Sequence, residues 1–148
     1  MKNDKAKLHE IIEQFSAISN QDERIDLLID FASKYEFVKA LNKSEPFDEN
    51  NKVNNCLSGV YVWVEKITDD NFDIKFVVKN PQAITAKAFC AILGEGLKLE
   101  NSKSILSVND GIIEEIFGNR LSFGKRIGLT NILQYIKNQI RQIEEKSP

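Results

Sequence analysis

The sequence has few side chains that could act as nucleophiles or metal ligands. Its 148 residues include two cysteines, Cys56 and Cys90, and one histidine, His9. Protein metal sites of the tetrahedral kind need several closely spaced Cys or His ligands, so this set predicts no metal site. A Cys–His catalytic pair is also unexpected, because His9 occupies a polar, exposed-looking position of the first helical segment. Any nucleophilic chemistry therefore depends on Cys56.

Several longer features are missing as well. No apolar run approaches the roughly 18 residues that cross a bilayer, and residues 1–7 do not start a signal peptide. The 20 basic and 22 acidic side chains nearly balance, whereas nucleic-acid binding needs a basic surface. Glycine-rich phosphate loops and the nucleophile-elbow motif are absent. We therefore expect a cytoplasmic protein with reduced thiols that binds neither membranes nor nucleic acid.

Hydrophobic periodicity near 3.6 residues predicts several helices. The first covers residues 4–18, and the second begins at a cap formed by Ser19 or Asn20 and ends near residue 34. A strongly apolar helix over 82–93 follows Asn80 as cap and Pro81 as first helical residue, and stops at Gly94 and Gly96. We expect a polar stretch at 98–104, a short helix at 110–117, a loop at 119–127 and a last helix over 129–143.

The middle of the chain changes to a period of two. Apolar and polar residues alternate over 60–65 and 72–77, and residues 68–71 form a turn signal, which predicts an antiparallel hairpin. The preceding polar segment, 39–52, is expected to be a loop. We find no repeat, low-complexity tract or linker. Residues 1–148 therefore predict one α+β domain, in which a small antiparallel β-sheet packs against helices.

Cys56 lies in a polar turn immediately before the first predicted strand. A functional thiol must be accessible and able to ionise near neutral pH, and a loop anchored by a strand suits both needs. Asn54, Asn55 and Ser58 could donate hydrogen bonds to the sulfur or its anion. The alternative is a small buried residue that plugs the mouth of the strand, since free cysteine is among the most buried residue types. The residues around Cys56 leave both interpretations open.

Two other groups could assist such a thiol. Cys90 lies within the apolar helix, between Phe89 and Ala91, and is predicted to be a packing residue. The alternative, use as a resolving thiol for Cys56, would need close approach of the two Cα atoms. Lys125 and Arg126 lie in a glycine-bounded segment just before the last helix. Two cations there could bind an acidic partner or stabilise a thiolate. They could equally be the solvated entrance of a helix.

The turn around Cys56 resembles the motif of the SufE family, the sulfur-acceptor proteins that stimulate SufS-type cysteine desulfurases. The resemblance spans roughly residues 8–141. The family motif around the acceptor cysteine reads N-x-V-x-G-C-x-S-x-V-W, and the matching residues here are Asn51, Val53, Cys56, Ser58 and Val60. Asn55 replaces the glycine, and Tyr61 stands at the tryptophan position. Asparagine is the residue that, after glycine, best accepts a positive φ.

Two later segments carry the resemblance further. Residues 84–93 are similar to the family's apolar helix, with Lys87 at its cationic position. The family also shows L-[ST]-P-S-R-x-x-G-L near the C-terminus, matched here by Leu121, Ser122, Gly128 and Leu129. Lys125 falls at the arginine position, with Arg126 beside it. Lysine is a point charge without the planar fork of arginine, so a bidentate role is not expected.

The resemblance implies a SufE/IscU-like fold and a transpersulfuration step. Cys56 would take sulfur from the persulfide of a SufS-type desulfurase and relay it to an iron–sulfur scaffold such as the SufBCD complex. In the family, the acceptor side chain is sheltered in an apolar pocket at rest and swings out toward the partner. Pyridoxal phosphate would belong to the desulfurase, and no cofactor is expected in this chain. A homodimer is compatible with the resemblance. The supporting or partner-binding residues implied are Asn55, Ser58, Lys87, Lys125 and Arg126.

Two alternatives come from other functional classes. SufE-like and IscU-like proteins share a fold, so the chain could be a scaffold for iron–sulfur assembly. Such a scaffold typically needs three or more thiolate or imidazole ligands in one site, and Cys56 stands alone in its loop. The chain could also be a docking module that binds a desulfurase without accepting sulfur. The departures at Asn55 and Lys125 keep that second alternative open.

Overall fold

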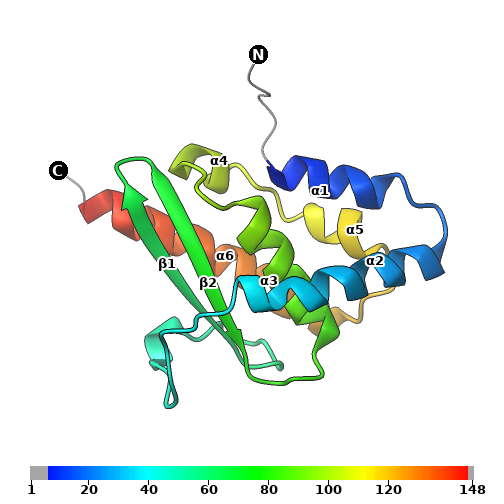
Figure 1. Ribbon diagram of the computed structural model, residues 1–148, viewed down its shortest axis with the longest axis horizontal. Coiled ribbons are helices and arrows are strands. Elements are labelled where there is room, and N and C mark those ends of the chain that lie inside the picture. The colour runs from blue at the N-terminus through cyan, green and yellow to red at the C-terminus, as the bar shows by residue number, and fades with distance from the viewer. Residues whose placement is uncertain (1–6, 147–148) are drawn as a thin grey trace.

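The computed structural model describes residues 7–146, which form helices and one two-stranded antiparallel hairpin (Figure 1). The α+β class predicted from the sequence is confirmed. In chain order the elements are α1 (Lys7–Ser16), α2 (Gln21–Ser33), the 3-10 helices η1 (Lys34–Phe37) and η2 (Glu49–Asn51), β1 (Val60–Thr68), β2 (Asn71–Val78), α3 (Ile84–Gly96), α4 (Ser102–Leu106), α5 (Ile112–Phe117) and α6 (Phe123–Lys146).

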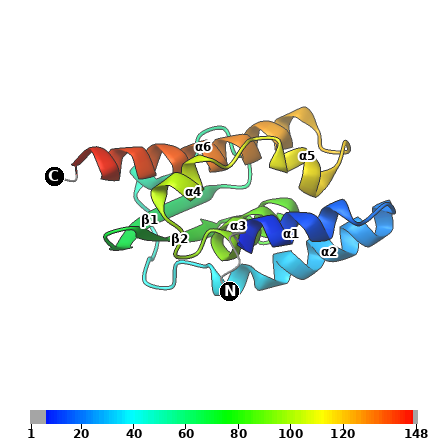
Figure 2. The same cartoon turned by 90° about the horizontal axis from the view of Figure 1, so that it is seen from above.

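Helix α3 lies at the centre of the helical part. It packs against α1, α2 and β2, while α6 packs against β1, and both helices contribute to the same hydrophobic core. Figure 2 shows α6 running along one side of the molecule, with α3 and the hairpin between it and α2. Most of α3 is buried, which explains why its sequence is apolar on nearly all sides. The long helix α6 faces β1, and its first turns lie across a pocket from the start of α3.

The hairpin has the register that its period of two predicts. Val60 pairs with Val78 and Val62 with Phe76, and the side chains of this face are buried in the core. On the opposite face, the rings of Tyr61 and Trp63 are covered by Phe47 of the preceding loop, with the centroids of Phe47 and Tyr61 5.1 Å apart. The hairpin prediction is confirmed, and its first strand begins directly after the segment that carries Cys56.

The predicted boundaries of α3 are wrong at both ends. The side-chain oxygen of Asn80 accepts from the backbone N–H of Gln82 (3.0 Å), and its carbonyl accepts from Ala83 N–H (3.1 Å). Asn80 therefore closes a turn that precedes the helix, and α3 begins only at Ile84. At the other end α3 continues through Gly94 to Gly96, so these glycines do not stop the helix where predicted. Gly94 instead allows close packing of α3 against Val38 and Phe76.

The loop predicted at 119–127 is also wrong, because α6 begins at Phe123. The hydroxyl of Ser122 accepts from Lys125 N–H (3.2 Å), and its carbonyl accepts from Arg126 N–H (3.0 Å). Ser122 is thus the N-cap of α6. Consequently, Lys125 and Arg126 occupy the first helical turn, where adjacent side chains point in different directions.

The remaining helices differ less from the predictions. Asn20 caps α2 as expected, accepting from the backbone N–H of Asp22 at 2.7 Å. The polar stretch at 98–104 includes the start of the short helix α4, which Asn101 caps. Helix α1 ends at Ser16, earlier than predicted, and residues 4–6 of the predicted helix lie outside the described residues.

Replacement of Gly94 by alanine tests the packing of α3. A Cβ atom at this position would lie 2.5 Å from Cγ1 of Val38 and 3.2 Å from a ring carbon of Phe76. Overpacking of this kind costs about 1–3 kcal/mol, so the free energy of unfolding in urea should fall by that amount. Gly124→Ala is the matched control, because nothing lies within 4 Å of its Cβ. Equal losses in the two variants would contradict the packing account.

Candidate functional site

Cys56 lies in a short closed loop, residues 53–59, which we call the cysteine loop. The backbone N–H of Val53 donates to the carbonyl of Val60 (2.9 Å), which closes the loop where β1 begins. Inside it, the N–H of Gly59 donates to the carbonyl of Cys56 (3.1 Å) and forms a tight turn. The strand thus fixes the position of the loop, while Cys56 itself lies in irregular backbone.

Two residues of the cysteine loop have positive φ. Gly59 has a φ of 69°, and Asn55, the residue before the cysteine, has a φ of 55°. Asparagine tolerates this left-handed region better than most residues with a side chain. The side chain of Asn55 is exposed and does not line the pocket described below. Its place in the site is therefore to set the backbone conformation that turns Cys56 inward.

The sulfur of Cys56 packs directly against α6. A Cβ atom built on Gly128 would lie 3.4 Å from Sγ of Cys56 and 3.5 Å from its Cα. Gly128 is buried, and Cys56 is half-buried at the edge of the hydrophobic core. A side chain longer than that of alanine at 128 would occupy the place of the sulfur. The glycine of the C-terminal motif therefore makes room for the cysteine of the central motif.

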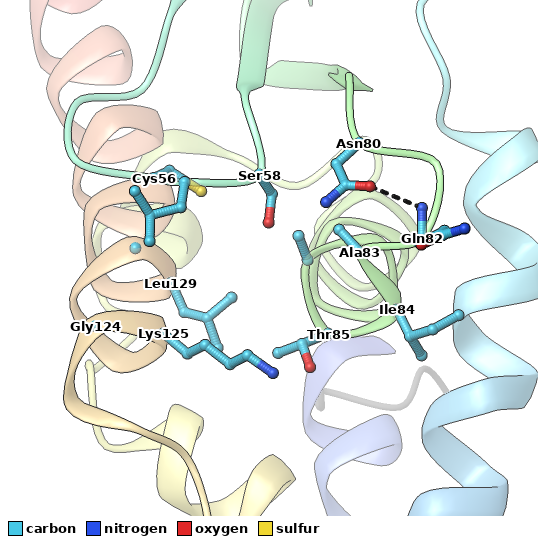
Figure 3. A pocket seen from close by; sticks show the side chains of 13 residues that line it. Cys56, Ser58, Asn80, Gln82, Ala83, Ile84, Thr85, Gly124, Lys125 and Leu129 are labelled. Atoms are coloured by element: carbon cyan, nitrogen blue, oxygen red, sulfur yellow. Dashed lines mark hydrogen bonds between the residues drawn. The ribbon is translucent and has the colours of Figure 1, made fainter.

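A pocket of about 480 Å³ opens beside Cys56. It lies between the cysteine loop, the turn before α3, and the first turns of α3 and α6 (Figure 3). Its wall combines apolar side chains with a few polar ones, a composition typical of small binding sites. The residues that line it are Cys56, Leu57, Ser58, Asn80, Gln82, Ala83, Ile84, Thr85, Ala86, Gly124, Lys125, Gly128 and Leu129.

The structure separates the cations that the sequence grouped with Cys56. Lys125 lines the pocket and extends from α6 toward Thr85 of α3 (Figure 3). Arg126 does not line it and forms an ion pair with Glu114 of α5. Among the described residues that line the pocket, Lys125 is the one with a charge.

Lys87 lies outside the pocket lining but supports one of its walls. Its ammonium donates to the carbonyl of Pro81 (2.6 Å) and lies 5.6 Å from the ring centroid of Tyr35. Tyr35 in turn accepts a hydrogen bond from the backbone N–H of Val78 at the end of β2 (2.8 Å). Lys87 therefore holds the turn at 80–83, which borders the pocket, against the end of the sheet.

Burial controls the acidity of both thiols. It raises the pKa of Cys56, and hydrogen bonds from the backbone of Ser58 and Val60 offset part of this increase. Cys90 is completely buried in α3, and its pKa lies well above the ordinary value, first through burial and then through the charge of a Cys56 thiolate. The prediction that Cys90 is a packing residue agrees with its full burial. His9 is exposed on α1, 3.6 Å from Glu13.

Several residues of the site were not predicted from the sequence. Gln82 and Thr85 line the pocket, and two residues of α6 bind the backbone around the cysteine loop. The amide of Asn131 donates to the carbonyl of Asn54 (2.9 Å), and the hydroxyl of Tyr135 donates to the carbonyl of Asn50 (2.7 Å). Helical spacing from Gly128 could have indicated them, because positions three and seven residues later fall on the same side of a helix.

The comparison with protein families gives the site its context. The family model of the SufE domain, described as an Fe-S metabolism associated domain, matches residues 9–140. The chain belongs to the SufE family. SufE membership indicates a sulfur-acceptor role in iron–sulfur metabolism and points to a cysteine desulfurase as partner. The matched region includes the cysteine loop, the turn before α3 and all the residues that line the pocket.

A solved structure has the same SufE-like fold. The solution structure of a hypothetical protein from Thermus thermophilus superposes with a TM-score of 0.71 and 24% sequence identity. The alignment covers 95% of this chain and 97% of that protein. No curated protein sequence matches the chain. At this identity the likeness concerns the fold alone.

Residues 7–146 of the SufE chain contain no helix that is long and apolar enough to cross a membrane. Within the same residues, no three His, Cys, Asp or Glu side chains lie in an arrangement that could hold a metal ion.

The pH dependence of Cys56 alkylation tests its burial. Because burial raises the thiol pKa, the folded protein keeps its proton at pH values where the unfolded chain has lost it. The protonated Cys56 thiol therefore contributes to the free energy of unfolding below the pKa of the unfolded chain. This contribution is lost as the pH rises through the higher pKa of the folded protein. We expect iodoacetamide to modify Cys56 in a Cys90→Ala variant with a midpoint above the ordinary cysteine value. The urea-unfolded chain is the control, and a folded midpoint at or below that of the control would contradict this.

Proposed function

We propose that Cys56 accepts sulfur from the persulfide of a SufS-type cysteine desulfurase and carries it as a persulfide. The observation that supports this most is the position of the thiol, half-buried on a surface loop with a pocket of about 480 Å³ beside it. A second sulfur atom needs such space next to the first. Cys90 has no comparable space, because it is completely buried in α3.

The chemistry is thiol exchange and needs no oxidant. The Cys56 thiolate attacks the outer sulfur of the desulfurase persulfide, and a new sulfur–sulfur bond forms on Cys56. The old sulfur–sulfur bond breaks, and the desulfurase cysteine leaves as a thiolate. This thiolate takes up a proton, which replaces the one that the Cys56 thiol lost when it ionised. A thiolate of raised pKa is less abundant but intrinsically more nucleophilic, which offsets part of the cost of burial.

Lys125 is suited to assist this step. Lys125 is the charged residue among the described residues that line the pocket. No carboxylate of residues 7–146 forms an ion pair with its side chain. A cation close to a thiolate or persulfide anion favours the charged form. Lysine can do this as a point charge, without the bidentate geometry that an arginine would provide.

Exposed apolar side chains lie in the pocket lining or next to it in the chain and suit a docked partner. Leu57 is 97% exposed and Phe123 78% exposed, at the tip of the cysteine loop and at the start of α6. Ile84, which lines the pocket, is 45% exposed. Clusters of this kind often mark protein interfaces. A desulfurase bound here would cover them and bring its own persulfide to the pocket.

The sulfur would then pass to an iron–sulfur scaffold such as the SufBCD complex in the cytoplasm. In this proposal pyridoxal phosphate stays with the desulfurase, and the SufE-like chain contributes the acceptor thiol and the docking surface.

Transfer of label from cysteine tests the acceptor. The protein is incubated with a SufS-type desulfurase and ³⁵S-cysteine, and the reducible label on the chain is measured. We expect label on the wild type and on Cys90→Ser, and none on Cys56→Ser. Label that survives in Cys56→Ser would overturn the assignment. Stimulation of the desulfurase without label on the wild type would show a docking module instead.

The same assay separates the two neighbouring cations. Lys125→Met should lower the rate constant of transfer roughly 3- to 10-fold, because the pocket loses its positive charge, an effect moderated by solvent screening. Arg126→Met is the matched control and should transfer sulfur at the wild-type rate, since Arg126 pairs with Glu114 outside the pocket. A larger loss in Arg126→Met than in Lys125→Met would contradict the role of Lys125.

A further inference from the structure

The cysteine loop is held on two sides by different kinds of contact. On the side of β2, backbone groups pair: the N–H of Lys79 donates to the carbonyl of Gly59 (2.9 Å), and the N–H of Asn80 donates to the carbonyl of Ser58 (3.1 Å). On the side of α6, the loop is bound by a side chain, the amide of Asn131, which donates to the carbonyl of Asn54. The two sides therefore differ in how easily they can separate.

The contact through Asn131 lies close to the sulfur. It holds the carbonyl two residues before Cys56, next to the positive φ of Asn55. Gly128 also touches Cys56, but it has no side chain and offers only van der Waals contact. Within residues 7–146, the bond from Asn131 is the hydrogen bond that joins residues 54–57 to α6. Breaking it would leave the cysteine with no polar attachment to the helix.

The segment before the cysteine loop is fixed more firmly. The hydroxyl of Tyr135 donates to the carbonyl of Asn50 (2.7 Å), and the amide of Asn51 donates to the carbonyl of Val62 in β1 (2.9 Å). This segment is thus attached to the helix and the sheet at once. Movement of the loop would therefore be confined to the few residues around Cys56.

We propose that Asn131 is a positioning residue that latches Cys56 in its sheltered place against α6. Release of its bond to Asn54 frees residues 54–57 to turn the sulfur outward, while Tyr135 keeps the base of the loop in place. The latch rests on the proposed function, since outward movement matters to a thiol that exchanges sulfur with a partner. It adds a residue that controls how often Cys56 is presented.

Alkylation of the isolated protein tests the latch. Iodoacetamide is added under native conditions, and modification of the Cys56 and Cys90 peptides is followed by mass spectrometry. One neutral hydrogen bond shifts an equilibrium roughly 2- to 10-fold, so Asn131→Ala should accelerate modification of Cys56 by that factor. Cys90 is completely buried and reports general unfolding, so its rate should stay at the wild-type value.

The chain offers a matched control on the same helix. Asn138 of α6 is exposed and accepts from Arg141 (2.8 Å), away from the loop. Alanine favours helix over asparagine equally at both positions, so neither change weakens α6. Asn138→Ala should leave the Cys56 rate unchanged. Asn131→Leu provides a second test, because its neutral side chain keeps about the volume of the amide but cannot donate, and it should accelerate Cys56 as well.

Three results would overturn the latch. An unchanged Cys56 rate in both Asn131 variants would show that the bond does not hold the loop. Parallel acceleration of Cys56 and Cys90 would assign the effect to general destabilisation. Tyr135→Phe should accelerate Cys56 less than Asn131→Ala, and an equal or larger effect would place control at the base of the loop. No desulfurase takes part, so this outcome is independent of the sulfur-transfer assay.

Discussion

The close approach between the cysteine loop and α6 is the constraint on which the site depends. It is possible because Gly128 has no side chain, which leaves Sγ of Cys56 3.4 Å from the place of a Cβ. The same helix presents Lys125 nearly one turn earlier and Asn131 nearly one turn later. One side of α6 therefore provides the wall behind the sulfur, a positive charge in the adjoining pocket and the bond that holds the cysteine loop.

Shelter and reactivity oppose each other at such a thiol. Burial raises the pKa of Cys56 and so lowers the fraction of reactive thiolate. In the proposed function, the same burial would limit contact of a Cys56 persulfide with water and oxidants. A loop fixed to the sheet by backbone pairs and to α6 by one amide reconciles the two needs. It provides a sheltered position at rest and a short movement to the surface.

The elements that could be predicted from sequence are those with a long buried face. The hairpin follows from a period of 2, and α3 follows from its apolar run after Asn80 and Pro81. The start of α6 was missed because Ser122 is followed by Phe123 and Gly124, which are weak helix formers. That error also hid the different directions of Lys125 and Arg126. Helical spacing from Gly128 indicates the side of α6 on which Asn131 lies, but its partner, Asn54, is 77 residues earlier and could not be identified from the sequence.

The most direct test of the account is the reactivity of the persulfide itself. Cys56 is loaded with sulfur by the desulfurase, the desulfurase is removed, and the rate at which cyanide takes the outer sulfur as thiocyanate is measured. If the pocket between α3 and α6 shelters that sulfur, the folded protein should react much more slowly than the same persulfide in the urea-unfolded chain. Equal rates in the folded and unfolded states would contradict the account.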